Sequence, residues 1–315
     1  MPTQANHPLP AGYQLHGYEI EKVLSCGGFS IVYLAKDAAG EQTAIKEYLP
    51  SSLALRGADE ISPEISEENL ATFRYGMKCF FEEGRALASL SHPNIIRVIN
   101  FFRANETVYL VMKYERGRTL QEHVQVKKGN VRENFIRRVF TMSLNGLREV
   151  HSNKLLHLDL KPANIYIRND HTPVLIDFGA ARQTLAQGQF KLNPMYTPGF
   201  ASPEQYRNRE LMGPWSDLYS IGAAMYACVA GTAPPAADQR VEKDKYIPAI
   251  KQFAGRYSEH LLETIDWCLQ LDYLKRPQSA VALQKVLLRE RDPEIASRRT
   301  FVLNLRGALS RLGRR

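Results

Sequence analysis

Two short segments in the middle of the chain carry residue types that suit phosphoryl transfer. Residues 157–164 read His-Leu-Asp-Leu-Lys-Pro-Ala-Asn, and Asp177 follows thirteen residues later. Asp159 is a candidate base, and Lys161 is a candidate cation for phosphate oxygens. Asn164 and Asp177 offer oxygen atoms of the kind that Mg²⁺, a hard cation, prefers. Together these residues provide most of what transfer of a phosphoryl group from a nucleotide requires.

These segments resemble the catalytic loop and the metal-binding turn of the protein kinases, His-Arg-Asp-x-x-x-x-Asn and Asp-Phe-Gly. One position differs, because Leu158 stands where many members of the family carry Arg. Any single residue here could instead belong to an Asx turn or a helix cap. The occurrence of all of them at this spacing favours the chemical interpretation.

The loop after the first predicted strand resembles the glycine-rich loop of the same family. Gly27 matches the middle glycine and Gly28 follows it, whereas Ser25 and Ser30 occupy the first and third glycine positions. Glycine lets backbone amides approach phosphate oxygens without an intervening side chain. An ordinary hairpin would explain this loop alone, and its spacing to Lys46 is what favours a phosphate-binding role.

Lys46 resembles the strand lysine of the family, which pairs with nucleotide phosphates. A surface lysine is the plainer interpretation, but Ile45 and Lys46 must face opposite sides of their strand. Glu83 is the expected partner of Lys46, because its spacing to the downstream His-Pro-Asn-Ile segment fits the family, and Glu82 is the alternative. Between them lies an insertion at 50–69, to which the sequence assigns no role.

The resemblance also implies an adenine pocket, with ATP as the nucleotide and Mg²⁺, or alternatively Mn²⁺, as the metal. Tyr166 would form its floor, where the family usually has a smaller aliphatic residue. Adenine is therefore expected to sit differently, or the pocket to be partly closed without nucleotide. The other expected residues are Val32 and Ala44 above the ring, Met112 at the back, and Lys113 and Glu115 at the adenine edge.

The segment from Asp177 to Glu204 resembles the activation segment of the family. Thr197 matches the threonine that hydrogen-bonds the catalytic Asp and Lys in Ser/Thr-specific members. Glu204 is expected to form a buried ion pair with Arg276, and breaking one half should cost several kcal/mol. Asp217 is expected to hydrogen-bond the backbone of the catalytic loop, although a plain helix N-cap is compatible with its position.

Hydrophobic periodicity predicts a strand-rich first third and a helix-rich remainder. Strands are expected at 18–24, 31–35, 44–48, 95–102 and 108–114, with one helix at 67–90. Later helices are expected at 134–152, 217–230, 246–254, 258–271 and 278–290. We therefore predict an α+β, two-lobed, kinase-like fold: a small antiparallel sheet with one main helix, and a larger helical lobe.

The predicted parts are an N-terminal extension at 1–17, a first lobe at 18–112, a hinge at 113–117, a second lobe at 118–290 and a basic amphipathic tail at 291–315. The composition, 44% apolar and 23% charged, is ordinary for a globular protein. No apolar run is long enough for a spanning helix, and no secretory signal is apparent. Four scattered cysteines suit a reducing compartment, so we expect a cytoplasmic protein.

The net charge of +8 is uneven, because the tail has seven Arg against one Asp and one Glu and so supplies +5. The remainder, near +3, gives no reason to expect nucleic acid. Apolar residues recur at helical spacing among the Arg residues of the tail. It could bind the inner face of a membrane or a regulatory partner, or it could dock on the helical lobe or fray.

The resemblance implies transfer of the γ-phosphate of ATP to Ser or Thr hydroxyls of protein substrates, with autophosphorylation. Lys161 favours such acceptors, and segments 45–50 and 199–206 resemble bacterial members of the eukaryotic-type (Hanks-type) Ser/Thr kinases. A pseudokinase that binds nucleotide without turnover is one alternative, favoured by two missing glycines and Tyr166. A small-molecule phosphotransferase is another, although that class generally lacks the partner Arg276.

Leu158 leads to an expectation about regulation. The Arg that is usual at this position draws in a phosphate on the activation segment. Because this cation is missing, activity is expected to depend little on phosphorylation of Thr184 or Tyr196.

Overall fold

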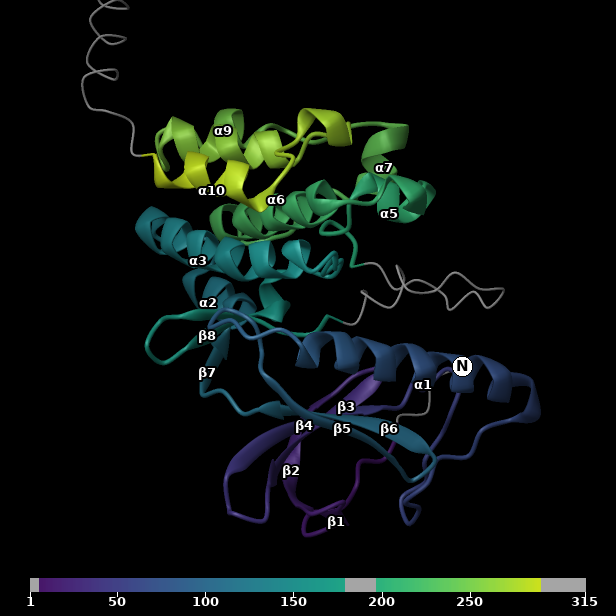
Figure 1. Cartoon of the computed structure of the whole chain (residues 1–315). Helices are drawn as coiled ribbons and strands as arrows, with labels where there is room; N and C mark the ends of the chain where they lie inside the picture. The colour runs from purple at the N-terminus through teal and green to yellow at the C-terminus, as the bar shows by residue number, and fades with distance from the viewer. Residues whose placement is uncertain (1–5, 179–196, 290–315) are drawn as a thin grey trace, which may run out of the picture.

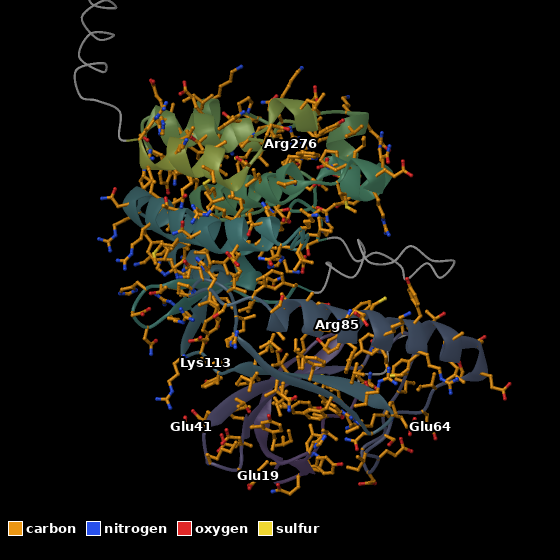
Figure 2. The ribbon with its side chains drawn as sticks, viewed as in Figure 1. Glu19, Glu41, Glu64, Arg85, Lys113 and Arg276 are labelled. Atoms are coloured by element: carbon orange, nitrogen blue, oxygen red, sulfur yellow. The ribbon has the colours of Figure 1, made fainter. Side chains whose placement is uncertain are left out.

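The computed structural model describes residues 6–178 and 197–289. An antiparallel sheet crossed by one long helix forms one end, and a stack of helices forms the other (Figure 1). In Figure 2 the exposed Glu19 and Glu64 lie at the outside of the sheet part, whereas Arg276 lies among the helices. The predicted two-lobed α+β architecture is confirmed.

The six-stranded sheet has the order β1-β2-β3-β4-β6-β5, with all neighbouring strands antiparallel. The sequence predicts five of these strands and misses β1, because two residues are too few for a periodic pattern. β1 belongs to the predicted N-terminal extension, so that part of the extension pairs with the sheet. The strands are β1 (Gln14–Leu15), β2 (Tyr18–Cys26), β3 (Ser30–Lys36), β4 (Gln42–Tyr48), β5 (Val98–Ala104) and β6 (Thr107–Lys113).

Helix α1 (Glu67–Ala88) crosses the sheet and carries Glu83. Two glutamates in its first turn suit the positive end of the helix dipole. Its buried face, which includes Phe80, packs against β5 and β6. The helix approaches β4 closely at Gly76, where a Cβ would lie 1.9 Å from the Tyr48 hydroxyl. A glycine at this turn therefore sets the distance between α1 and the strand that carries the candidate lysine.

The helical part is built around α6 (Pro214–Ala230), in which every residue from 216 to 229 is buried. α6 packs against α3 (Glu133–Ser152), α9 (Glu259–Cys268) and α10 (Ala280–Leu288). The helix predicted at 246–254 is shorter than expected, because the residue before Pro248 is disfavoured in the helical region. The smaller elements are α2 (Leu120–Lys127), α5 (Pro203–Arg207), α7 (Ala237–Glu242), α8 (Ala249–Gln252) and a sheet of β7 (Gly117–Thr119), β8 (Ile165–Arg168) and β9 (Pro173–Leu175).

The insertion after β4 carries a buried arginine into the sheet part. Arg56 is 1% exposed and donates to both carboxylate oxygens of Glu47, at 2.7 Å each. The hydroxyls of Tyr33 and Tyr109 donate to the same carboxylate, also at 2.7 Å. The Nε of Arg56 donates to the carbonyl of His7 at 2.8 Å, so the N-terminal residues close over this group. The insertion is therefore part of the packed sheet lobe.

Some predictions fall outside the described residues. These are the basic tail at 291–315 and the phosphorylation candidates Thr184 and Tyr196, and the expectations for them stay predictions. Within the described ranges, no helix combines the length and the apolar character needed to cross a membrane.

Candidate active site

A cavity of about 530 Å³ lies between the sheet and the helical part and collects most of the predicted site residues. The predicted residues that line it are Ser25, Val32, Ala44, Lys46, Glu83, Met112, Lys113, Glu115, Asn164, Tyr166 and Asp177. Residues that the sequence did not single out, among them Leu24, Leu110 and Ile176, complete its apolar walls. These residues could not be identified from the sequence, because an apolar residue that faces a cavity has the same pattern as one that faces the core.

Lys46 has an ion-pair partner that was not predicted from the sequence. Lys46 Nζ lies 2.5 Å from Oδ1 of Asp177, and only 8% of the lysine side chain is exposed. Glu83, the expected partner, is buried and lines the same cavity, while the alternative, Glu82, pairs with Arg85. The backbone of Asp177 has a φ of 58°, and this left-handed turn directs the carboxylate toward the lysine. Lys46 thus forms an ion pair with the Asp-Phe-Gly turn, and its pairing with Glu83 stays a prediction.

Asp159, Lys161 and Thr197 form a closed set of hydrogen bonds. Lys161 Nζ donates to Asp159 Oδ2 at 2.8 Å and to Thr197 Oγ1 at 2.9 Å. Thr197 Oγ1 in turn donates to Asp159 Oδ1 at 3.0 Å. These are the contacts that the sequence predicted for Thr197. The Asp159 side chain is 19% exposed, so the carboxylate is held on several sides yet remains accessible.

Asn164 joins this set to the cavity. Its Nδ2 donates to both the main-chain oxygen and Oδ2 of Asp159, at 2.8 Å each. This hydrogen bonding turns Oδ1 of the amide away from Asp159. Asn164 and Asp177 line the same cavity and supply an amide oxygen and a carboxylate. Such a pair fits Mg²⁺, which is usually held by few protein oxygens together with substrate phosphates and water.

The glycine loop between β2 and β3 is tied to the start of the insertion. Ser51 donates to the carbonyl of Gly28 through its amide at 2.9 Å and through its hydroxyl at 3.2 Å. The amide of Gly27 donates to the carbonyl of Ser30 at 3.0 Å and closes the turn. Ser25 lines the cavity, whereas Gly27 and Gly28 do not. Contact between these two glycines and a nucleotide stays a prediction.

The predicted adenine edge lies where β6 leads into the connection between the two parts. Met112 and Lys113 end β6, and Glu115 follows in the connection. Arg168 on β8 holds the Glu115 carboxylate through two hydrogen bonds of 2.7 Å, a contact that the sequence analysis missed. Tyr166, on the same strand, lines the cavity. The ion pair thus ties the connection to the strand that supplies the expected floor.

Asp217 holds the backbone of the candidate catalytic loop, as predicted. Its carboxylate accepts from the amides of His157 at 3.0 Å and Leu158 at 2.8 Å. His151 Nε2 lies 2.8 Å from the same carboxylate, a partner that the sequence analysis missed. Although complete burial opposes ionisation, these donors hold the pKa of Asp217 below its usual value. The N-cap of α6 is Gly213, so the plain N-cap role is wrong.

His157 and Leu158, the two residues before Asp159, are both buried. His157 is fully buried with its ring 4.2 Å from that of Phe178, and burial lowers the pKa of this histidine. The Leu158 side chain is 3% exposed, and its backbone has a φ of 60°. Its carbonyl accepts from Nε2 of Gln205 at 2.9 Å, another contact missed from the sequence. A left-handed residue is unfavourable unless its surroundings hold it, and here hydrogen bonds on both sides do so.

Replacing Asp217 with Asn is expected to lower the free energy of unfolding by about 1.5–3 kcal/mol, the size of a hydrogen bond to a charged group. The amide would present a donor to one of the two backbone amides that the carboxylate now accepts. Because the folded-state pKa is depressed, the contribution of Asp217 is present above its ordinary pKa of about 3.9 and is lost as the pH falls. Denaturation at several pH values should show the difference between the two proteins shrinking below about pH 4. A constant difference would contradict this linkage.

The sequence matches the protein kinase domain over residues 18–288. The chain belongs to the protein kinase family. It is 30% identical over 279 residues to serine/threonine-protein kinase B of Synechocystis sp., covering 84% of this chain and 45% of that protein. Serine/threonine-protein kinase D of the same organism is 28% identical over 284 residues, with coverage of 87% and 52%. The chain therefore spans about half the length of these relatives.

Solved kinase structures resemble this kinase domain closely. The apo form of PpkA-294 has a TM-score of 0.80 and 34% identity, covering 90% of this chain and all of that one. The kinase domain of PknI from Mycobacterium tuberculosis has a TM-score of 0.66 and 19% identity, covering 89% and 98%. At 19% identity the second likeness concerns the fold alone.

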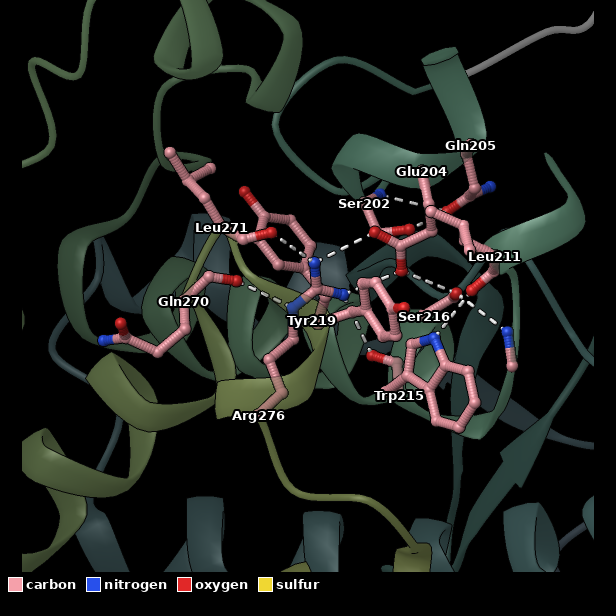
Figure 3. A network of polar contacts seen from close by, with 12 residues as sticks. Ser202, Glu204, Gln205, Leu211, Trp215, Ser216, Tyr219, Gln270, Leu271 and Arg276 are labelled. Carbon is pink, nitrogen blue, oxygen red and sulfur yellow. Dashed lines mark hydrogen bonds and ion pairs between the residues drawn. The ribbon is translucent and has the colours of Figure 1, made fainter. Parts of the chain in front are cut away.

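A buried ion pair in the helical part of this kinase domain ties the end of the expected activation segment in place (Figure 3). Arg276 Nη1 and Nη2 donate to the two carboxylate oxygens of Glu204 at 2.8 and 2.9 Å, as predicted. Ser216 Oγ also donates to Glu204, and the guanidinium reaches the carbonyls of Gln270 and Leu271. Burial opposes the charge of Glu204, but Arg276 and Ser216 hold its pKa below the usual value. The end of the segment is thereby fixed to α6 and to the turn before α10.

Proposed function

We propose that this kinase domain transfers the γ-phosphate of Mg-ATP to Ser or Thr hydroxyls of protein substrates, including its own chain. The observation that carries the proposal is the hydrogen-bonded set of Asp159, Lys161 and Thr197, in which a lysine and a threonine orient an accessible carboxylate. The relatives in Synechocystis, named as serine/threonine-protein kinases, support the same acceptor class.

The described residues have distinct roles in the proposed reaction. Asp159 accepts the proton of the substrate hydroxyl as that oxygen bonds to the γ-phosphorus and the bond to the ADP oxygen breaks, giving ADP and a phosphoester. Lys161 stabilises negative charge on the transferred group. Lys46 would pair with phosphate oxygens of the nucleotide. Asn164 and Asp177 would hold Mg²⁺, which neutralises phosphate charge when bound.

We assign the cavity of about 530 Å³ to the rest of the nucleotide. Val32 and Ala44 on one side and Tyr166 on the other would enclose the adenine. Lys113 and Glu115 would offer backbone groups to its edge. The apolar walls favour a flat base by excluding water from both of its faces.

The test is incubation of the purified chain with Mg²⁺, labelled ATP and a generic protein acceptor, followed by mapping of the phosphorylated residues. Phosphoserine or phosphothreonine in the acceptor and in the chain itself is expected. Parallel incubations contain an aminoglycoside or choline in place of the protein acceptor. Transfer confined to these small molecules would favour a metabolite kinase, and nucleotide binding without any transfer would favour a pseudokinase.

Replacing Thr184 with Ala is expected to change the initial rate by less than about twofold. The Leu158 side chain is apolar and 3% exposed, so it offers no charge to a phosphate on the activation segment. The measurement compares initial rates of wild type and variant before and after preincubation with Mg-ATP. A large loss of activity in Thr184→Ala would count against regulation that is independent of phosphorylation.

A further inference from the structure

A second cavity, of about 970 Å³, opens beside the nucleotide cavity and carries a concentration of positive charge. It is formed by β7, α2, the start of α3 and the loop before α9, and in Figure 1 α2 lies between β7 and α3. Arg118 lines both cavities, so they adjoin. We call this site the basic pocket, and its cationic residues are Arg118, Lys127, Arg132, Arg138 and Arg256.

The acidic residues that line the basic pocket do not neutralise its positive charge. Among its lining residues, all of which the structure describes, Glu133 is the one acid. The Glu133 carboxylate accepts from Arg137 Nε at 2.8 Å and from the amide and hydroxyl of Ser258 at 2.8 and 2.6 Å. It is therefore engaged by groups that are not part of the pocket wall. No carboxylate in the described ranges forms an ion pair with the five cations.

The walls of the basic pocket are held in place by hydrogen bonds. Arg256 Nη2 donates to Asn130 Oδ1 at 2.7 Å, and the Tyr257 hydroxyl donates to the carbonyl of Val131 at 3.0 Å. These bonds fix the loop before α9 against the segment that leads into α3. The shape of the basic pocket is therefore maintained by these hydrogen bonds as well as by its long side chains.

A histidine adds a neutral donor to this surface. The His123 ring stacks on Phe135 with 4.2 Å between centroids, and Arg118 lies 3.0 Å from Nδ1. Because arginine can only donate, Nδ1 accepts and the proton is on Nε2. Burial, followed by the charges of Arg118, Lys127 and nearby basic residues, lowers the pKa of His123. The basic residues that contribute to this lowered pKa also favour the binding of an anion at this surface.

The first turn of α3 faces the same cavity. Residues 133–135 line it, and the N-cap residue, Arg132, makes no side-chain capping hydrogen bond. The first amides of a helix lack partners within the helix and lie at the positive end of its dipole. Compact anions bind well at such helix ends, and four arginines line the same cavity as this end of α3.

We propose that the basic pocket binds a phosphorylated Ser or Thr within a peptide segment. Four of its five cations are arginines, whose planar guanidinium groups bind phosphate through paired hydrogen bonds. The cations line one cavity of about 970 Å³, which suits a phosphorylated side chain with part of its peptide, rather than a stripe along which a nucleic acid backbone would run. The choice of a peptide as the carrier rests on the proposed function, whose products are phosphorylated Ser and Thr segments.

The test measures binding of a fluorescent alanine-glycine peptide with one central phosphothreonine to the full chain. Fluorescence polarisation is recorded alongside the unphosphorylated twin, with inorganic phosphate as a competitor. The phosphorylated peptide is expected to bind at least about tenfold more tightly, since charge-assisted hydrogen bonds are lost in the twin. Competition by inorganic phosphate alone, without preference between the peptides, would overturn the peptide assignment.

Matched variants locate the binding. Arg132→Gln combined with Arg138→Gln is expected to weaken binding of the phosphopeptide about tenfold or more. Arg148→Gln combined with Lys154→Gln removes the same charge from exposed positions outside the pocket and is expected to leave binding unchanged. If both variants lose the same affinity, the effect comes from the net charge of the chain rather than from the pocket, and the proposal is wrong.

Two further measurements distinguish this proposal from the proposed function and from binding of another ligand. Both double variants should retain wild-type transfer to a generic acceptor, because none of these residues belongs to the active site. If the wild type binds the phosphopeptide but transfers no phosphate, the proposed function is wrong while the proposal for the basic pocket stands.

Duplex DNA and phosphatidylserine vesicles are tested in parallel. If the pocket variant loses more affinity for either of these than for the phosphopeptide, the pocket belongs to that partner and the proposal is wrong.

Discussion

Replacement of Asp159 by Asn is expected to lower the rate of phosphoryl transfer by about 10²–10⁴-fold, the range that a positioned base contributes. Asn cannot accept the proton of the substrate hydroxyl. It would also present a neutral amide to Lys161 Nζ, which lies 2.8 Å from the carboxylate. Because Asn has nearly the same shape, the melting temperature and the affinity for ATP are expected to change little. Initial rates with labelled ATP measure the effect.

The matched control for this prediction is Asp59→Asn, which removes one carboxylate from an exposed position of the insertion. Its rate should equal that of the wild type. Lys46→Met is expected to abolish transfer as well, through loss of the cation that faces the phosphates. Rates near wild type in both Asp159→Asn and Lys46→Met would show that the catalytic centre has been placed wrongly.

Replacement of Arg56 by Met is expected to lower the free energy of unfolding by about 3–5 kcal/mol, the cost of leaving a buried charge without its partner. Glu47 is fully buried, and Arg56 binds both of its oxygens at 2.7 Å. Burial and the nearby carboxylate raise the pKa of Tyr33 and of Tyr109, so both stay neutral donors. Two hydroxyls alone would then have to solvate the charge. Urea denaturation measures the loss.

A second substitution distinguishes charge from packing at this site. Adding Glu47→Gln to Arg56→Met removes the uncompensated carboxylate and is expected to recover at least half of the lost free energy. Arg148→Met, at an exposed position, should stay within about 0.5 kcal/mol of wild type. A similar loss is expected for Arg276→Met, which would leave Glu204 buried without its bidentate partner. A loss below about 1 kcal/mol for Arg56→Met would show that Glu47 is not charged in the folded protein.

The residues proposed to carry out the chemistry could be found from local sequence. Asp159, Lys161 and Asn164 lie within one short loop, and their types and spacing are those that the proposed transfer of a phosphoryl group requires. The Glu204–Arg276 pair and the contact of Thr197 with Asp159 join distant residues, yet both were predicted because each belongs to a motif with its own recognisable neighbours.

The supporting contacts could not be found in that way. His151 contacts Asp217, and Gln205 contacts the Leu158 carbonyl. His151 belongs to no motif, and the resemblance of segment 199–206 assigned no contact to Gln205. A polar residue in a helix can equally well face solvent, so neither contact could be predicted. The short elements β1 and α2 were missed because hydrophobic periods need longer segments.

The sequence by itself determined the family, the two lobes and the residues proposed for the reaction, because these depend on residue type, spacing and long periodic patterns. Only the tertiary structure decided that Lys46 pairs with Asp177 and that the insertion buries Arg56 against Glu47. Both outcomes depend on where several segments meet. A buried charge is stable only when its partners converge on it from separate parts of the chain, and linear spacing does not encode that convergence.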